Sequence, residues 1–469
     1  MNRRSFFKNT TLATVGTGLL LPEQIFANEI LSNKNKKAKN IIFMVSDGMS
    51  SGTLNMADIY MQRKYGKGSN WLNLYRENKV RRGLMDMASA SSIVTDSAAA
   101  SSSWGSGFRV KNGSLNVSVD GEALLPIWQK FKKVGKKAGC VTTVPITHAT
   151  PAGFLVNSKS RNSQEDIAET YLSQGFDVLL GGGDQYFNAE KRKDKKDLYT
   201  AYAQKGYQVV KNKTSLKNTN ATKPVLGVFY QDALPYRVDW NHQTDLQEKV
   251  PTLAEMTTKA IDLMKDHSKG FVLQVEAGRV DWAAHANDIG GLLYDQVAFD
   301  EALQVAIDFT EKNPDTLLII CTDHGNANPG LLYGKNANEH FDSLQSYQQS
   351  NDFLLNQITP QNSVQQIQEM IQSVHGILLE KEEAQTLHKY YQGLEPNEEG
   401  IYNYKNLPFA SYAQIQKKRN SVGWIGTDHS ADFVEICMMG AGSHLMPGFL
   451  KNTDLHYLML QAAEVENKF

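Results

Sequence analysis

Six short, continuous apolar runs, separated by stretches of helical periodicity, constrain the fold of this chain more than any other feature. Strands buried on both faces lack the polar alternation of a half-exposed sheet, so five of these runs are predicted to be parallel strands. The five runs are residues 41–45, 140–145, 271–275, 317–321 and 433–439, and the sixth strand is residues 177–180.

The stretches between these runs are helical in pattern. One face is marked by Phe299, Ala302, Leu303, Ala306 and Thr310, and a second pattern spans residues 253–264. Alternation of strands and helices is typical of α/β proteins. We therefore predict one large three-layer domain with a mostly parallel central sheet and helices on both faces.

The N-terminal segment has the order of an export signal. Arg3 and Arg4 come first, a modest apolar stretch follows, and a small residue, Ala27, ends it. The paired arginines resemble a twin-arginine signal, with an ordinary secretory signal as the alternative. Both place the mature bacterial protein outside the cytoplasm, in the periplasm or secreted. The predicted division is a signal at 1–27, a linker at 28–39 and the domain at 40–469.

Composition excludes several classes of protein. With 41% hydrophobic residues and a formal net charge of −1, the chain is neither disordered nor a basic nucleic-acid binder. No apolar run reaches the length of a membrane span. Cys140, Cys321 and Cys437 each lie in an apolar run, which favours buried free thiols and leaves a single bridge between two of them open.

Acidic residues, threonine and histidine follow four of the predicted strands. They are Asp47 after the first, His148 and Thr150 after the second, Glu276 after the third, and Asp323 with His324 after the fourth. A single Asp at a strand end is more often a turn former or a helix cap. Four such ends meet at one edge of a parallel sheet, however, where ligands bind. Their carboxylates would repel one another, so we expect cations between them.

Two further patterns point to chemistry. Asp281 and His285 lie four residues apart, so a helix places both on one face at a spacing that suits zinc, although a surface ion pair is the alternative. Ser97 follows Asp96 and opens an alanine-rich stretch that favours helix. A helix N-terminus also favours bound phosphate, which makes Ser97 a candidate nucleophile; a plain helix cap is the alternative.

Taken together, these motifs resemble those of the alkaline phosphatase family. The segment 95–99, Thr-Asp-Ser-Ala-Ala, is similar to the family's nucleophile motif. The other matching segments are 45–49, 148–153 with Arg161, 180–183, 276–285, 323–324 and 427–429. The resemblance covers about residues 40–330 and 420–447, whereas 331–420 diverges and is expected to be an insertion or cap near the mouth of the site.

The resemblance implies hydrolysis of phosphate monoesters to an alcohol and inorganic phosphate, through a phosphoserine on Ser97. It implies one zinc ion on Asp281, His285 and His429, a second on Asp47, Asp323, His324 and Ser97, and Mg²⁺ on Asp47, Thr150 and Glu276. Arg161 would bind two phosphate oxygens, and Asp96 would hold Arg161 in place. His444 is the alternative to His429. The family also implies a homodimer, which no residue here identifies.

Two residues depart from the best-known bacterial members. His148 stands where those members have Asp, so the identity of the third ion is open and the imidazole is either a ligand or a partner of one. Trp282 stands where Lys or His is frequent, and it either contacts substrate or packs against the helix of Asp281.

Two other function classes have to be weighed. A phosphodiesterase or sulfatase of the same superfamily would lack the third-site trio or use another nucleophile. A non-catalytic metal- or phosphate-binding protein would not need Ser97, Arg161 and every ligand together.

Overall fold

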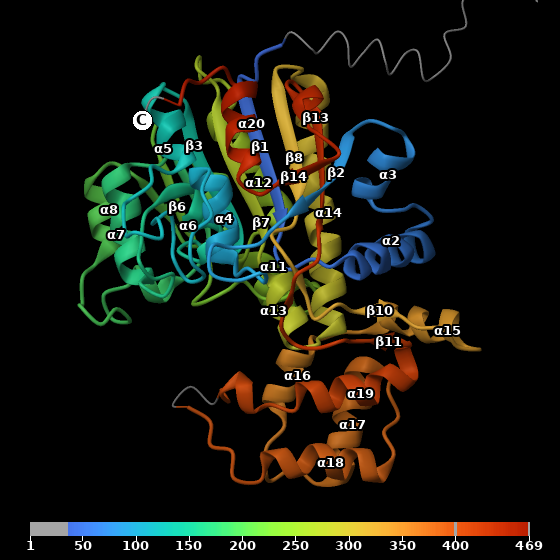
Figure 1. Ribbon diagram of the computed structural model, residues 1–469. Helices are drawn as coiled ribbons and strands as arrows, with labels where there is room; N and C mark the ends of the chain where they lie inside the picture. Colours follow the sequence, from blue (N-terminus) through green and yellow to red (C-terminus); the bar gives the residue numbers. More distant parts are fainter. Residues whose placement is uncertain (1–35, 398–400, 468–469) are drawn as a thin grey trace, which may run out of the picture.

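The computed structural model describes residues 36–397 and 401–467, and the predicted signal at residues 1–27 lies outside that part. Its centre is a ten-stranded sheet with the strand order β14-β2-β13-β8-β1-β7-β3-β4-β6-β5 (Figure 1). The strands are β1 (Asn40–Ser46), β2 (Arg81–Asp86), β3 (Lys137–Pro145), β4 (Val178–Gly182), β5 (Gln208–Val210), β6 (Val225–Val228), β7 (Phe271–Ala277), β8 (Thr316–Cys321), β13 (Val434–Gly440) and β14 (Phe449–Lys451).

All six predicted strands are present, and the prediction of a mostly parallel α/β sheet is confirmed. The predicted orientation of residues 433–439 is wrong, because β13 runs antiparallel to both of its neighbours, β8 and β2. The chain enters β13 from β12 (His429–Ser430), which already lies at the carboxyl edge of the other strands. A strand that starts at that edge must run back from it.

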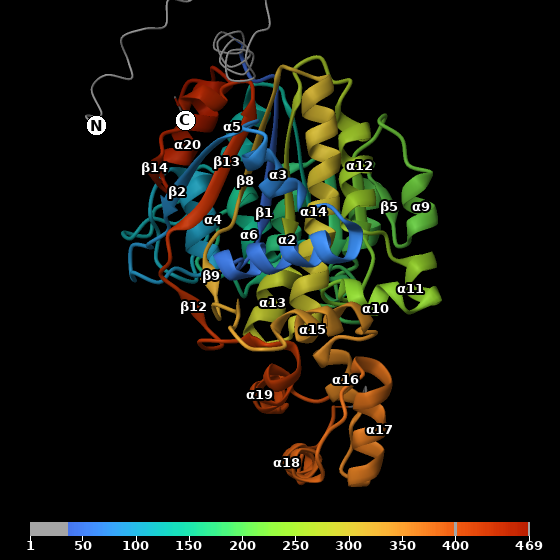
Figure 2. The same ribbon diagram turned by 90° about the vertical axis from the view of Figure 1, so that its right-hand side faces the viewer.

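Helices cover both faces of the sheet and define two hydrophobic cores (Figures 1 and 2). One face carries α2 (Ser51–Tyr65), α3 (Asn70–Arg76), α12 (Leu253–Met264) and α14 (Ile289–Lys312). The other carries α4 (Ser97–Ser106), α5 (Ile127–Lys133), α6 (Ala149–Leu155), α7 (Gln164–Gln174) and α20 (Asp454–Ala462). Both helices predicted from periodicity, α12 and α14, are confirmed.

Helices α4 and α6 pack unusually closely because small residues line their contact. A Cβ on Gly153 would lie 2.1 Å from Ser101 Oγ, and a Cβ on Gly105 would lie 1.9 Å from Gly153 O. Ser101 Oγ, in turn, donates to the carbonyl oxygens of Ser97 and Ala149 at 2.7 and 3.1 Å. The first turns of the two helices are therefore held together through one hydroxyl group.

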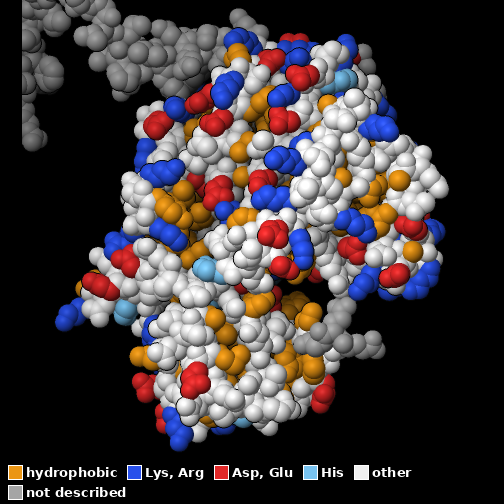
Figure 3. Space-filling model, turned by 180° about the vertical axis from the view of Figure 1, so that it is seen from behind, with side chains coloured by type: hydrophobic (Ala, Val, Ile, Leu, Met, Phe, Trp, Pro, Cys, Tyr) orange, Lys and Arg blue, Asp and Glu red, His pale blue; other side chains and the backbone are white. Residues whose placement is uncertain are grey.

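Most of residues 331–420 form a helical region that extends beyond the carboxyl edge of the sheet and shares the hydrophobic core of one sheet face (Figure 1). Its helices are α15 (Ala337–Asp342), α16 (Asn351–Gln357), α17 (Val364–His375), α18 (Lys381–Tyr391) and α19 (Phe409–Asn420). At its root, β10 (Gly330–Leu331) pairs with β11 (Val422–Gly423). Figure 3 shows a hollow between this region and the main body.

A buried histidine organises the interior of this helical region. The two ring nitrogens of His375 lie 2.7 Å from Tyr412 Oη and 2.8 Å from Gln349 O. Its ring stacks on Tyr347 at a centroid distance of 4.2 Å. Burial lowers the pKa of His375 to about 4, so the ring is neutral and serves packing.

Cys140, Cys321 and Cys437 are buried and free, which confirms the prediction of three free thiols and excludes a bridge between two of them. Among the described residues, no helix combines the length and the apolar character that crossing a membrane requires.

Candidate active site

The sheet order explains why the candidate residues converge. Strands β8, β1, β7 and β3 are consecutive neighbours, and all four run parallel. Val45 lies opposite both Glu276 and Cys321, so Asp47 and Asp323 emerge beside Glu276 at the same edge. The loop after β3 adds His148, and it leads into α6 with Thr150.

The first ligand group consists of Asp281, His285 and His429. Asp281 and His285 lie on α13 (Arg279–His285), one turn apart as predicted. Oδ2 of Asp281 lies 3.4 Å from His285 Nε2, Oδ1 lies 3.6 Å from His429 Nε2, and the two Nε2 atoms are 3.1 Å apart. These atoms face a common centre.

Backbone carbonyl groups select the tautomer of both histidines in this group. Nδ1 of His285 lies 2.6 Å from Thr427 O, and Nδ1 of His429 lies 2.9 Å from Thr95 O. A carbonyl oxygen only accepts, so each Nδ1 carries the proton, which leaves the lone pair of Nε2 for a cation. The contact with Thr95 also ties His429 to the loop that precedes Ser97.

The second ligand group consists of Asp47, Asp323 and His324, all of which are buried. Nε2 of His324 lies 3.3 Å from Asp323 Oδ2 and 3.6 Å from Asp47 Oδ1. The other oxygen of Asp323 accepts from Gly48 N at 2.9 Å, which fixes the carboxylate. Ser97 Oγ lies 3.1 Å from His324 Nε2, so the candidate nucleophile faces this group.

The third ligand group consists of Asp47, His148 and Glu276, with Thr150 beside them. Thr150 Oγ1 donates to Asp47 Oδ2 at 3.1 Å. Thr142 Oγ1, on β3, donates to Glu276 Oε2 at 2.5 Å. Asp47 belongs to the second and third groups and so joins them.

Burial and mutual repulsion shape the protonation of these carboxyl groups. Burial, reinforced by Asp323, Asp281 and Glu276, raises the pKa of Asp47 well above its usual value. Burial raises the pKa of Glu276 to about 7 and that of Asp323 to about 8. So many carboxyl groups cannot all ionise at neutral pH unless cations lie among them.

In the first group the pKa of the carboxyl group is lowered rather than raised, because histidines surround Asp281. Burial alone would raise the pKa of Asp281, but His285, His429 and His324 lower it below its usual range. Although burial opposes the change, Asp281 in return raises the pKa of His285 to about 9. A cation that binds there must therefore displace a proton from His285.

The donor set of the three groups fits metal ions. Within residues 36–397 and 401–467, Asp47 Oδ1, Asp323 Oδ2 and Glu276 Oε1 are buried without a hydrogen-bond partner. The first group offers two imidazole nitrogens and one carboxylate, and the second and third each offer one imidazole nitrogen and two carboxylates, which are donors that divalent cations accept. Thr150 adds a hydroxyl oxygen beside the third group.

Arg161 lies between Asp96 and His148. Its guanidinium group donates to Asp96 Oδ2 at 3.1 Å and lies 3.1 Å from His148 Nε2. Burial, reinforced by Arg161, lowers the pKa of His148 to about 3, so the ring is neutral and its Nε2 accepts from Arg161. While that contact lasts, Nε2 is not available to a metal ion.

Asp96 has more contacts than the sequence suggested. It caps α4 by accepting from Ala99 N at 2.9 Å, and it also accepts from Gly113 N at 2.9 Å. Arg161 N donates to Gly113 O at 2.8 Å. One carboxylate thus fixes the helix of Ser97 and the position of Arg161 together.

Trp282 and His444 lie in different surroundings. Trp282 is half-buried, and its ring lies 6.0 Å from the ring of His148 and 5.4 Å from the guanidinium carbon of Arg279. His444, the alternative to His429, lies in a short 3-10 turn (Ser443–Leu445) and belongs to none of the three ligand groups.

Sequence reasoning missed Thr142 and Asn326, which bond to Glu276 and Asp281. Thr142 lies inside an apolar run, and the strand pairing Thr142↔Glu276 is visible only in the structure. Asn326 follows His324 by two residues, and that proximity is its only signal.

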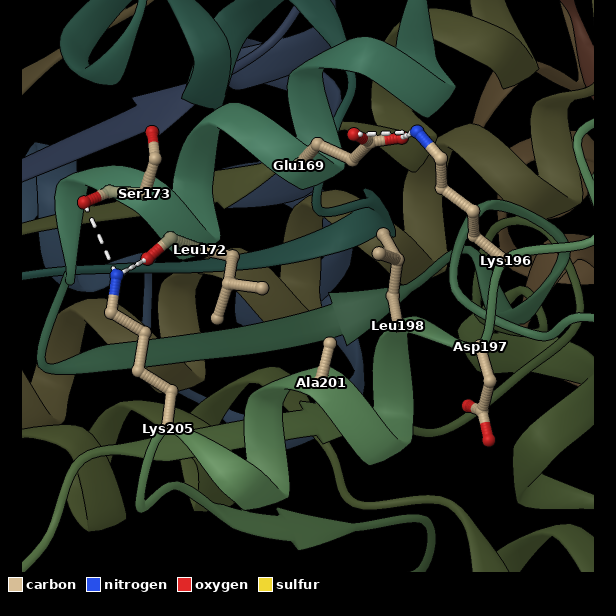
Figure 4. A pocket seen from close by; sticks show the side chains of 8 residues that line it. All are labelled: Glu169, Leu172, Ser173, Lys196, Asp197, Leu198, Ala201 and Lys205. Carbon is tan, nitrogen blue, oxygen red and sulfur yellow. Dashed lines mark hydrogen bonds and ion pairs between the residues drawn. The ribbon is translucent and has the colours of Figure 1, made fainter.

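A pocket of about 600 Å³ between α7 and α8 (Leu198–Gln204) lies apart from these groups (Figure 4). Its two lysines are engaged: Lys196 pairs with Glu169 at 2.8 Å, and Lys205 donates to the carbonyl oxygens of Leu172 and Ser173. None of the predicted site residues lines this pocket.

A buried serine beside grouped candidate metal ligands, at the carboxyl edge of an α/β sheet, is the arrangement expected of a metal-assisted hydrolase. The family model described as alkaline phosphatase matches residues 38–465. The chain therefore belongs to the alkaline phosphatase family, and it is a phosphomonoester hydrolase.

Individual relatives agree over most of the length. Alkaline phosphatase 4 of Bacillus subtilis is 29% identical over 475 residues, which cover 97% of each chain. The alkaline phosphatase of Escherichia coli is 31% identical over 68% of this chain and 79% of its own. The crystal structure of Thermus thermophilus alkaline phosphatase has a TM-score of 0.85 at 34% identity, covering 95% of this chain and 96% of that one.

Proposed function

We propose that this chain hydrolyses phosphate monoesters through a phosphoserine on Ser97, with two zinc ions in the first and second ligand groups and Mg²⁺ in the third. The observation that carries the proposal is the 3.1 Å distance from Ser97 Oγ to His324 Nε2, which puts the hydroxyl group among the second-group ligands. A serine that only capped its helix would not face them, and Asp96 already performs that capping.

The reaction proceeds in two displacements at phosphorus. Ser97 Oγ forms a bond to phosphorus while the bond to the alcohol oxygen breaks. Water then attacks the phosphoserine, the bond to Ser97 breaks, and inorganic phosphate leaves; overall, water supplies a hydroxyl group to phosphate and a proton to the alcohol. When bound, the cations would lower the pKa of the serine hydroxyl and of the attacking water and balance charge on the departing oxygen.

The chain's own residues prepare this step. Ser97 begins α4, whose free N–H groups favour an anion in front of it. In this proposal Arg161, which donates to Asp96, binds two phosphate oxygens in a bidentate way, and it exchanges its contact with His148 for phosphate.

Replacing Arg161 with lysine tests its role. Lysine keeps the charge but loses the planar pair of donors, so we expect KM for a monoester and the inhibition constant of inorganic phosphate to rise about tenfold or more. Arg109→Lys is a matched control, because Arg109 pairs with Asp86 at 2.8 Å outside the ligand groups. Equal phosphate inhibition of Arg161→Lys and the unmodified enzyme would refute the role.

Metal analysis of active protein, combined with rates on matched monoester and diester substrates, tests the proposal as a whole. We expect two zinc ions and one magnesium ion per chain, and monoester turnover at least about 100-fold above diester turnover. Faster diester or sulfate-ester turnover would establish the alternative, a phosphodiesterase or sulfatase of the same superfamily.

We also propose that the chain is exported and acts as a homodimer. Export is supported by the order of charge, apolar stretch and small residue in residues 1–27. N-terminal sequencing of the mature protein would show a start near residue 28, and an intact Met1 would contradict export. Light scattering that finds only the mass of one chain would contradict the dimer.

A further inference from the structure

We propose that Asn326 is a positioning residue for the first ligand group: its side-chain amide orients Asp281 while its backbone fixes the strand that carries His429. The inference rests on the proposed role of this group as a zinc site. Asn326 contacts the segments of Asp281 and His429, and it faces Asp281 with its amide nitrogen, which has no free lone pair for a cation.

The side chain of Asn326 makes the decisive contact. The residue is fully buried, and Nδ2 donates to Asp281 Oδ1 at 2.7 Å and reaches Asp281 O at 3.3 Å. A carboxylate only accepts, so the atom that faces it is the amide nitrogen. With Oδ1 held there, Oδ2 stays turned toward His285 Nε2 at 3.4 Å. One hydrogen bond thus fixes the rotation of the Asp281 carboxylate.

The backbone of Asn326 pairs with the strand that carries the ligand His429. Strand β9 (Gly325–Asn326) pairs with β12 in an antiparallel ribbon in which Asn326 lies opposite His429. Asn326 N also donates to Ser50 Oγ at 3.0 Å, close to Asp47 in sequence. The residue therefore joins three segments that carry ligands, and it follows a fourth, Asp323 with His324, in the chain.

The backbone immediately after Asn326 has an unusual conformation that its surroundings fix. Ala327 and Asn328 have φ values of +53° and +40°, in the left-handed region that favours glycine. Such residues cost of order 1 kcal/mol or more each and persist where the surrounding structure fixes them. Here Ala327 N donates to Asp428 O at 2.9 Å, which ties this turn to the residue before His429.

The chemistry of an amide suits this position. Because it does not ionise, it donates to Asp281 at every working pH and adds no charge that would compete with a cation. Partners of metal ligands of this kind typically contribute about 10- to 100-fold to metal affinity.

Asn326→Ala and Asn326→Leu test the proposal; both remove the amide donor, and leucine keeps most of its volume. Competition with a zinc chelator should show one site per chain weakened about 10- to 100-fold and the other unchanged. Activity should fall at limiting zinc and recover with excess zinc. Asn351→Ala is the matched control, because Asn351 is equally buried and pairs with Gln416 at 3.0 Å in the helical region.

Three outcomes would overturn the proposal. The first is zinc affinity within twofold of the unmodified protein in both variants. The second is equal weakening by Asn351→Ala, since the effect would then be general destabilisation. The third is failure of both variants to fold at saturating zinc, since Asn326 would then support the fold rather than the ligand. Failure of the proposed function would give a different result from failure of this inference, because the unmodified chain would itself bind no zinc.

Discussion

Ser97→Ala should lower turnover of phosphate monoesters by about 1,000-fold or more while leaving zinc and magnesium content unchanged. Removal of a catalytic nucleophile costs this much because binding and charge stabilisation alone give only a residual rate. Metal content should persist, since the grouped carboxylate and imidazole ligands remain. The measurements are initial rates, metal analysis and acid-quench trapping of labelled phosphoserine, which should vanish in the variant.

Ser103→Ala provides the control for this experiment. Ser103 lies on the same helix, is equally buried, and donates only to Ala99 O at 2.9 Å among its described contacts. It should retain activity near that of the unmodified enzyme. Full activity of Ser97→Ala would contradict the assignment of the nucleophile. A phosphoenzyme trapped in that variant would contradict it as well.

Removal of metal by exhaustive chelation should abolish activity and also make stability strongly dependent on pH. Burial raises the pKa of Glu276 to about 7 and of Asp323 to about 8, whereas both titrate near pH 4 when unfolded. The folded metal-free chain therefore binds more protons than the unfolded chain between these values. These two carboxyl groups contribute stability that falls as pH rises from about 4 to about 8. His285, whose folded pKa is about 9, extends the loss to about pH 9.

Thermal unfolding at pH 6 and pH 9, with and without metal, measures this effect. We expect the metal-free Tm to be at least about 5 °C lower at pH 9 than at pH 6. Added zinc and magnesium should restore activity and remove most of the difference, since cations bind the ionised carboxylates. A metal-free protein that keeps its activity, or whose Tm rises with pH, would contradict the metal assignment.

Much of the fold could be predicted because buried parallel strands leave continuous apolar runs. This signal found β1, β3, β4, β7, β8 and β13. It failed for β2 and β14, which lie at one end of the sheet, and for β5 and β6 at the other. β2 begins with the exposed residues Arg81 and Arg82, and β5 has only three residues, so neither forms an apolar run.

The antiparallel direction of β13 could not be predicted from the sequence, because an apolar run is the same for a parallel and an antiparallel strand. Its direction follows from His429, which holds the preceding segment at the carboxyl edge beside Asp281. The entry point of β13 at that edge, which only the folded chain shows, goes with its antiparallel direction.

The candidate residues could be predicted because each is a chemically distinctive side chain at a strand end or helix start. The residues that hold them could not. Asn326 and Thr142 act through contacts made across large separations in sequence, and Thr95 and Thr427 act through backbone carbonyl groups that any residue possesses. Such partners emerge only when the fold brings the segments together.

The helical region of residues 331–420 is closed at its root, where Leu331 lies opposite Val422 in the β10–β11 ribbon. The ribbon of β9 and β12 lies one step closer to the ligands and pairs Asn326 with His429. Residues 332–421 lie beyond the β10–β11 ribbon, so their length can change without altering the β9–β12 pairing that holds the segments of His324 and His429 side by side, because loop length costs little once the ends are paired. The two ribbons therefore hold the ligand-carrying segments together at the root of a helical region that also packs into the core of one sheet face.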